Sequence, residues 1–207
     1  MYNLRPVPVS TVRPLFEEFH GYKSVGKIGV YCFGVYEGDL LVAAYVWQPP
    51  PPGASKSVCP EAPHGVLALS RMVALPKSQR SLKHISKPLR YQMKHLIDRT
   101  RYPVLITYSD EGQGHTGHVY KCSGWTKTTK RSVPYYEDAE GRRVSSYSSG
   151  AVVLGARDRK GTTIIQRWEH WVCERGQAAE SIRAGGWRRV PTGKFWRSGN
   201  PAFTWRQ

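Results

Sequence analysis

The stretch LSRMVALPKSQRSLKHISKPL, residues 69–89, decides the expected fold. Its first part belongs to an apolar run over residues 66–75, which predicts a buried strand. Apolar residues then recur at steps of three and four between Leu82 and Leu96, which predicts a helix. A strand, a short basic turn and a helix are therefore expected in succession.

Pro88 leaves two possible starts for this helix. A proline inside a helix costs about 3 kcal/mol, so the helix begins near Ser86 with Pro88 in its first turn, or begins near Ser81 and kinks. A second, basic stripe follows the same spacing and consists of Lys83, Lys87, Arg90 and Lys94.

The remaining segments predict a sheet flanked by helices. We expect a helix over 9–22 capped by Ser10 or Thr11, a hairpin over 27–48, an extended connector at 49–55, a strand over 102–110, a loop with a short helical turn over 114–125, an extended segment over 125–149 with a turn at Glu140-Gly141, and a helix over 163–176. This order is typical of a mixed α/β (α+β) domain. We divide the chain into a core domain, 1–145, and a basic, aromatic C-terminal extension packed on it, 146–207.

Composition favours a polyanionic partner. The net charge of +16 indicates nucleic acid first and an anionic membrane surface second, with a merely solvated basic surface as the alternative. No stretch has the length and apolarity of a membrane span, and the N-terminus lacks the apolar core of a secretion signal. The four cysteines are far apart and predict thiols in a cytoplasmic protein: Cys32, Cys59, Cys122 and Cys173.

Two segments resemble the GNAT acyltransferases. The first is residues 69–89, and the second is VYKCSGW, residues 119–125. The resemblance implies a GNAT-like central mixed sheet flanked by helices, with Tyr120 as a general acid. It also implies that Arg80, Ser81 and Lys83 hold the pyrophosphate of acetyl-CoA or another acyl-CoA-like donor through a helix-start anion site. The glycines that let a backbone approach a pyrophosphate are missing from this turn.

A narrower resemblance is to the Mom family of phage DNA-modification proteins. LSRMV, SLKHIS, YSD and GHTGHVYKCSGW carry it, in this order. It implies an enzyme that converts the exocyclic amine of adenine in DNA to a carbamoylmethyl form and so protects phage DNA from restriction. Double- or single-stranded DNA is then the expected partner and the bacterial host cytoplasm the location. The oligomeric state stays open, a dimer included.

Candidate site residues each have a structural alternative. Asp110 ends a strand and suits an amine-orienting or catalytic carboxylate, or a turn cap. Tyr120 suits a phenolic acid, or a core tyrosine. Arg71, on an apolar strand, and His115 are expected to contact substrate or phosphate. His115 and His118 form an HxxH pair, which on a helix would share a face and could bind metal.

His20 and Tyr22 complete the candidate site. The Mom resemblance implies a His-Tyr pair in activity, and here a glycine separates the two residues. If His20 approaches Asp110, the two could hold a metal such as iron, and the alternative is a histidine facing a helix C-terminus. Two other functions remain open: an ordinary N-acetyltransferase acting on a protein or small amine, and a non-catalytic nucleic-acid-binding protein.

Overall fold

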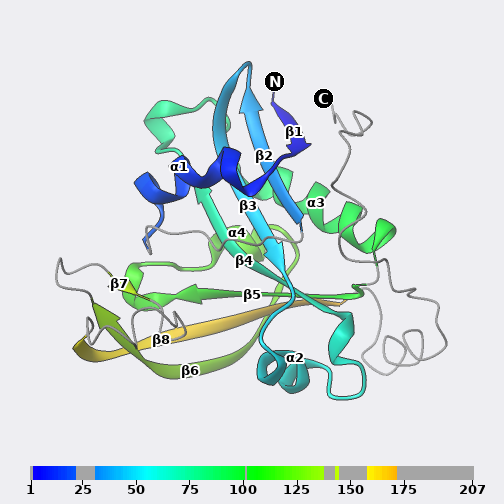
Figure 1. Ribbon diagram of the computed structural model, residues 1–207, viewed down its shortest axis with the longest axis vertical. Coiled ribbons are helices and arrows are strands. Elements are labelled where there is room, and N and C mark those ends of the chain that lie inside the picture. Colours follow the sequence, from blue (N-terminus) through cyan, green and yellow to red (C-terminus); the bar gives the residue numbers. More distant parts are fainter. Residues whose placement is uncertain (1, 22–30, 101, 138–142, 145–157, 172–207) are drawn as a thin grey trace.

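The computed structural model describes residues 2–21, 31–100, 102–137, 143–144 and 158–171. Within them, eight strands form one sheet in the order β1-β2-β3-β4-β5-β8-β6-β7 (Figure 1). The strands are β1 (Asn3–Pro6), β2 (Tyr31–Glu37), β3 (Leu40–Gln48), β4 (Val66–Ala74), β5 (Val104–Asp110), β6 (Thr126–Glu137), β7 (Arg143–Val144) and β8 (Asp158–Trp171). The α-helices are α1 (Val9–Phe19), α2 (Pro52–Val58), α3 (Ser86–Arg99) and α4 (His118–Cys122), and the 3₁₀ turns are η1 (Pro63–Gly65), η2 (Lys77–Gln79) and η3 (Glu111–Gln113). The expected mixed sheet with flanking helices is confirmed.

The stretch that decides the fold forms β4, the turn after it, and α3. The helix begins at Ser86, so the first of the two expected starts is confirmed. Pro88 is its third residue, where the backbone N–H would have no partner inside the helix. Its ring therefore costs the helix no hydrogen bond. Pro88 lies in the first turn of α3 and not in its interior.

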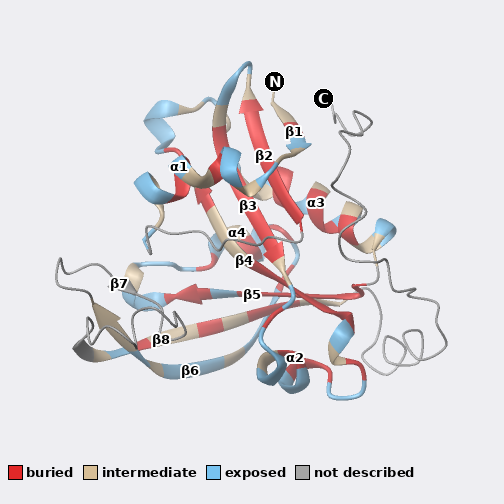
Figure 2. Cartoon of the chain, viewed as in Figure 1, coloured by how far each residue is buried: buried red, intermediate tan, exposed pale blue. Residues whose placement is uncertain are grey.

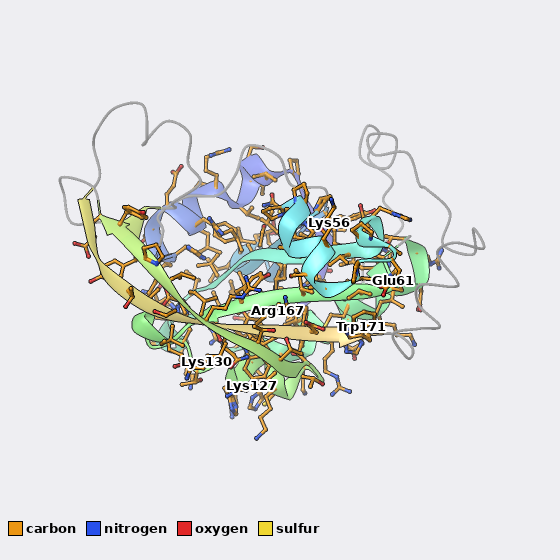
Figure 3. All side chains as sticks on the ribbon, turned by 90° about the horizontal axis from the view of Figure 1, so that it is seen from below. Lys56, Glu61, Lys127, Lys130, Arg167 and Trp171 are labelled. Carbon is orange, nitrogen blue, oxygen red and sulfur yellow. The ribbon has the colours of Figure 1, made fainter. Side chains whose placement is uncertain are left out.

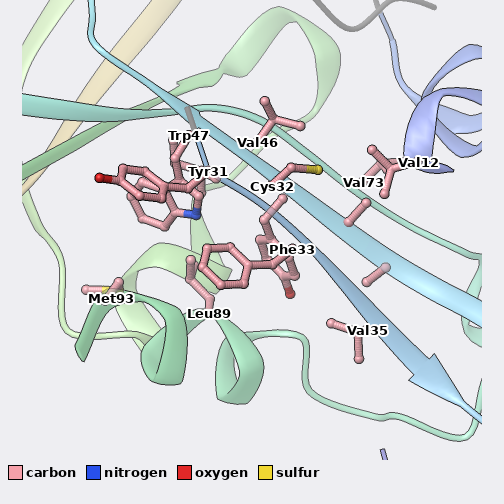
Figure 4. Close-up of a cluster of buried hydrophobic side chains, with 14 of the residues drawn as sticks. Val12, Tyr31, Cys32, Phe33, Val35, Val46, Trp47, Val73, Leu89 and Met93 are labelled. Carbon is pink, nitrogen blue, oxygen red and sulfur yellow. The ribbon is translucent and has the colours of Figure 1, made fainter. Parts of the chain in front are cut away.

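Helices cover both faces of the central strands. Val12 of α1 lies over Val46 and Val73 on one face, whereas Leu89 and Met93 of α3 lie on the opposite face (Figure 4). The buried parts of β2, β3, β4 and β5 lie between these layers, and β6 is largely exposed (Figure 2). A second, smaller core cluster packs α2 and the segment after it against β4 and β5. Its members are Val58, Cys59, Ala62, Val66, Ala68, Val104 and Ile106.

Trp47 of β3 anchors the layer under α3. Its ring is fully buried, and its indole N–H donates to Gln92 Oε1 at 3.0 Å. The ring also stacks on Trp125, with ring centroids 6.3 Å apart. A buried indole needs such a partner for its N–H, and the Tyr45 hydroxyl, which donates to the Ile85 carbonyl at 2.7 Å, joins β3 to the start of α3 a second time.

The sheet opens between β4 and β5, its only parallel neighbours among the described strands. The pairing consists of three residue pairs and ends at Ala68 and Ile106, although β4 continues to Ala74 and β5 to Asp110. Ser70 is an extra residue on β4 opposite the step from Val46 to Trp47, a bulge that bends the strand. The two strands therefore separate toward their C-terminal ends.

Two local predictions were wrong, and one strand was missed. Neither Ser10 nor Thr11 caps α1, because the helix already begins at Val9 after Pro8. Residues 49–55 are not extended throughout, since α2 begins at Pro52, and proline is tolerated at a first helical position. The N-terminal strand β1, which pairs with β2, was not predicted.

The helix expected over residues 163–176 is the strand β8 instead. It pairs with β5 on one side and β6 on the other. The run from Thr162 to Ile165 is β-branched throughout, which favours a strand. β8 lies in the range that we assigned to the C-terminal extension, and within the sheet it stands next to β5. The expected turn at Glu140-Gly141 lies outside the described residues.

Candidate active site

A cavity of about 640 Å³ lies where β4 and β5 separate. β4 contributes Ala68 to Met72, β5 contributes Thr107, Tyr108 and Asp110, and the loop into α4 closes one side with residues 114–120. Pro50, Pro51, Gln48, His20 and Ile165 line the rest. Five predicted site residues line this one cavity: His20, Arg71, Asp110, His115 and Tyr120.

Tyr120 is held in α4 with its ring packed on two tryptophans. The ring centroids of Trp125 and Trp168 lie 6.0 and 5.8 Å from that of Tyr120. Burial raises the pKa of the Tyr120 phenol above its ordinary value of about 10, and a hydrogen bond with Thr107 opposes this shift. The phenol therefore keeps its proton at neutral pH, which suits a hydrogen-bond donor or a general acid and not a general base.

Asp110 lies at the end of β5 and is 5% exposed. Its carboxylate accepts hydrogen bonds from the Gly112 amide at 3.0 Å, from Gln113 Nε2 at 3.2 Å and from the Thr163 hydroxyl. The turn-capping alternative is therefore confirmed as a geometric fact, because Asp110 is the N-cap of η3. Capping also fixes the carboxylate at the cavity wall.

His20 follows α1 and reaches the same region. The next residue, Gly21, lies so close to Gln113 that an added Cβ would be 1.9 Å from the Gln113 Oε1 atom. Gln113 in turn donates to Asp110, which links the end of α1 to the end of β5. Tyr22, the second residue of the implied His-Tyr pair, lies outside the described residues.

The two glycines of GHTGH shape the loop before α4. Gly114 and Gly117 both have positive φ, 72° and 70°, a conformation that favours glycine. His115 is exposed and lies in the loop, whereas His118 is the first residue of α4 and lies 3.4 Å from Cys122 Sγ. The two histidines are therefore not on one helix, so the shared helical face on which the metal-pair interpretation depended is absent.

Arg71 points its guanidinium along its own strand. The Nη1 group donates to the Ser70 carbonyl at 2.8 Å, and the residue lines the cavity while half-buried. This bond holds the cation at the bulge of β4, so β4 contributes a positive charge to the cavity lining.

The predicted cofactor residues lie elsewhere, in the turn between β4 and α3. Arg80 donates to the carbonyl of Leu75 at 2.9 Å and to that of Leu82, so its guanidinium closes the turn. Ser81 and Lys83 line a separate depression of about 270 Å³, together with Tyr2, Glu37, Leu82, His84 and Lys87. The carboxylate of Glu37 accepts hydrogen bonds from the amides of Ser81, at 2.8 Å, and Leu82.

Neither implied cofactor has a prepared site among the described residues as they lie. Among the described side chains, no three His, Cys, Asp or Glu residues converge on a point that could hold a metal ion, so iron at His20 and Asp110 stays a prediction. The amides that a pyrophosphate would require are bonded to Glu37. Binding of an acyl-CoA at this turn therefore requires Glu37 to move.

Sequence reasoning missed Thr107 in the cavity lining, Thr163 beside Asp110, and Glu37 at the separate depression. Thr107 bonds to Tyr120 and donates to the Leu69 carbonyl at 3.1 Å, and Thr163 donates to Asp110. A polar residue in the middle of an apolar strand was a usable signal for Thr107, because a buried hydroxyl needs partners. No local pattern pointed to Glu37, whose bonds span more than 40 positions.

The fold is that of the GNAT acetyltransferases. An N-acetyltransferase from Staphylococcus aureus Mu50 aligns with a TM-score of 0.54 and 8% identity, over 84% of this chain and 99% of that chain. A GNAT-family acetyltransferase from Desulfovibrio desulfuricans aligns with a TM-score of 0.51 and 12% identity, over 84% and 100%. An agmatine N-acetyltransferase in its apo form gives 0.50 and 12%, over 83% and 100%. At these identities the likeness concerns the fold alone.

The sequence identifies the family within this fold. It matches the Mom protein family over residues 1–188, and the chain belongs to that family. No curated protein matches the sequence. Within the described residues, no helix has the length and apolarity required to cross a membrane.

Proposed function

We propose that the protein modifies adenine in DNA by transferring a carbamoylmethyl group to the exocyclic amine, and that this protects phage DNA from restriction. Membership of the Mom family supports the proposal. The observation that carries it is that His20, Asp110 and Tyr120, which the family resemblance implies in activity, line one cavity. The GNAT fold supports a transferase in general.

The cavity has a size and lining that suit a flipped base. Its volume of about 640 Å³ lies within the range of small-molecule sites, roughly 300–1,000 Å³. An enzyme that acts on a base amine must take the base out of the stack. Tyr108 lines the cavity, is 41% exposed and so offers an aromatic face on which a base could stack.

Exposed cations supply contacts for a phosphate backbone. Lys127 and Lys130 project outward from β6 (Figure 3). On α3, Lys87, Arg90 and Lys94 are exposed as well. Lysine contacts to phosphate release counterions, so DNA binding should weaken steeply as salt rises. DNA binding would therefore account for the net charge of +16, which the candidate catalytic residues do not require.

The site residues divide the proton transfers of such a reaction. The adenine amine must lose a proton as it forms its new bond, and the leaving group of the donor must gain one. Tyr120 is the candidate donor of that proton, because its raised pKa keeps the phenol protonated. Asp110, fixed by three hydrogen bonds, is the candidate that orients the amine and accepts its proton, while the bond between the carbamoylmethyl carbon and the leaving group of the donor breaks.

The test is mass spectrometry of nucleosides from plasmid DNA after expression in bacteria. We expect deoxyadenosine carrying one carbamoylmethyl group with the wild type, and a loss of modification of about 10²- to 10⁴-fold with Tyr120→Phe, the usual share of a general acid. Tyr36→Phe is the matched control, since Tyr36 is buried but lies outside the cavity lining.

Three outcomes would count against the proposal. Unmodified adenine with well-expressed wild type would overturn it. Acetylation of a protein or small amine instead would favour an ordinary N-acetyltransferase. DNA binding without any modification, unchanged by Tyr120→Phe and Asp110→Ala, would favour a non-catalytic nucleic-acid-binding protein.

A further inference from the structure

The turn between β4 and α3 presents two backbone amides to one carboxylate. Glu37, at the end of β2, accepts from the Ser81 amide through Oε2 at 2.8 Å and from the Leu82 amide through Oε1. Each carboxylate oxygen thus has its own amide. Since these residues are 44 and 45 positions from Glu37, the contact joins two distant parts of the chain.

The surroundings of this contact favour an anion. Lys83, His84 and Lys87 line the depression of about 270 Å³ in which it lies. Adjacent backbone amides with cations beside them form an anion-binding position. Burial acts to raise the pKa of the Glu37 carboxyl, but the hydrogen bonds from Ser81 and Leu82 outweigh it, and the pKa is lowered. Glu37 is therefore the anion in this position at neutral pH.

Arg80 holds the turn in the conformation that receives Glu37. Its guanidinium donates to the carbonyls of Leu75 and Leu82, one on each side of the turn. The amide of Leu82 donates to Glu37 while its carbonyl accepts from Arg80. The N–H and the C=O of Leu82 thus both have partners inside the protein. While Glu37 is in place, neither the Ser81 amide nor the Leu82 amide is left for an external ligand.

We propose that Glu37 is an internal competitor for this anion position and determines donor specificity, by disfavouring donors that carry a diphosphate there. A diphosphate of the coenzyme A class binds at the turn only when Glu37 is displaced. The inference goes beyond the proposed function, because it concerns the donor side of the fold and holds for any acceptor.

The test is calorimetric titration of the full chain with coenzyme A and, separately, with pantetheine, which lacks the diphosphate. We expect Glu37→Ala to bind coenzyme A at least about tenfold more tightly than the wild type, a difference of about 1.4 kcal/mol. Glu37→Gln retains an acceptor for one amide and should give a smaller gain. Pantetheine affinity should be the same in all variants.

Asp39→Asn is the matched control. Asp39 is exposed and lies two residues away in the same hairpin turn, so its substitution removes an equal charge without freeing either amide. An equal gain with Asp39→Asn would reduce the effect to net charge and overturn the proposal. Wild-type affinity equal to that of both Glu37 variants, or no binding by any of them, would overturn it too. If Glu37→Ala fails to fold, Glu37→Gln decides by the same criterion. The assay contains no DNA, so its failure leaves the adenine hypothesis untouched.

Discussion

Replacing Gly117 by alanine should disturb the candidate site through one identifiable contact. An added Cβ would lie 2.2 Å from Cζ2 and 2.5 Å from Cε2 of the Trp168 ring. Trp168 has little room to move, because it is 2% exposed and its indole N–H donates to Ser109 at 2.9 Å. Its ring also packs on Tyr120, so a displaced Trp168 would push on the candidate acid.

The magnitude has two parts, which a second variant separates. A φ of +70° costs a residue with a Cβ roughly 1–2 kcal/mol, and overpacking a buried ring adds about 1–3 kcal/mol. Gly114 has nearly the same φ, +72°, with nothing within 4 Å of an added Cβ. Gly114→Ala should therefore lose about 1–2 kcal/mol of unfolding free energy and Gly117→Ala about 2–5 kcal/mol, as measured by urea denaturation.

The difference between the two variants carries the test. Equal losses for Gly114→Ala and Gly117→Ala would show that only backbone strain matters and that Trp168 does not press on residue 117. A Gly117→Ala variant that also kept full adenine modification would show that the position of Tyr120 tolerates a shifted Trp168.

Two further predictions concern buried polar groups. Thr163→Val should lower the free energy of unfolding by about 1.5–3 kcal/mol, because it removes a hydrogen bond to the buried carboxylate of Asp110. Urea denaturation measures this loss, and Thr162→Val, at an exposed position, is the control. Equal losses in the two variants would contradict the prediction. His95 has a pKa lowered by burial and then by Arg99, so below about pH 6.5 the unfolded chain binds more protons and stability falls with falling pH. His95→Gln should flatten that fall between pH 7 and 5, and an unchanged slope would refute the assignment.

Local pattern accounts for most of the fold. The spacing of apolar residues predicted β4, α3 and β5, whereas Pro88 left two starts open for α3, and the structure selects the one at Ser86. Their apolar spacing was enough to predict them, although the partners of β4 and β5 in the sheet are distant in sequence. The candidate site could also be predicted from local sequence, because Asp110, the last residue of β5, and Tyr120 of α4 belong to one continuous stretch of the chain.

Long-range pairing accounts for what the sequence did not predict. The segment around Trp168 contains apolar residues at spacings that suit a helix as well as a strand, and the two neighbours that select a strand, β5 and β6, are distant in sequence. Glu37 is a second example, because its role depends on a turn more than 40 residues away. In each case the partner, and not the local sequence, determines the structure.

The cavity between β4 and β5 and the turn after β4 together limit which donors can bind. If the cavity of about 640 Å³ receives an adenine base, as we propose, it leaves limited room for a second large molecule. A donor of the coenzyme A class would therefore extend toward the turn after β4, where Glu37 holds the amides of Ser81 and Leu82. A donor without a diphosphate has no such conflict. If Glu37→Ala gains affinity for coenzyme A and yet modifies adenine no faster than the wild type in cells, the modification does not depend on a diphosphate bound at that turn. If the affinity for coenzyme A and the rate of adenine modification rise together, the donor carries a diphosphate whose binding Glu37 weakens.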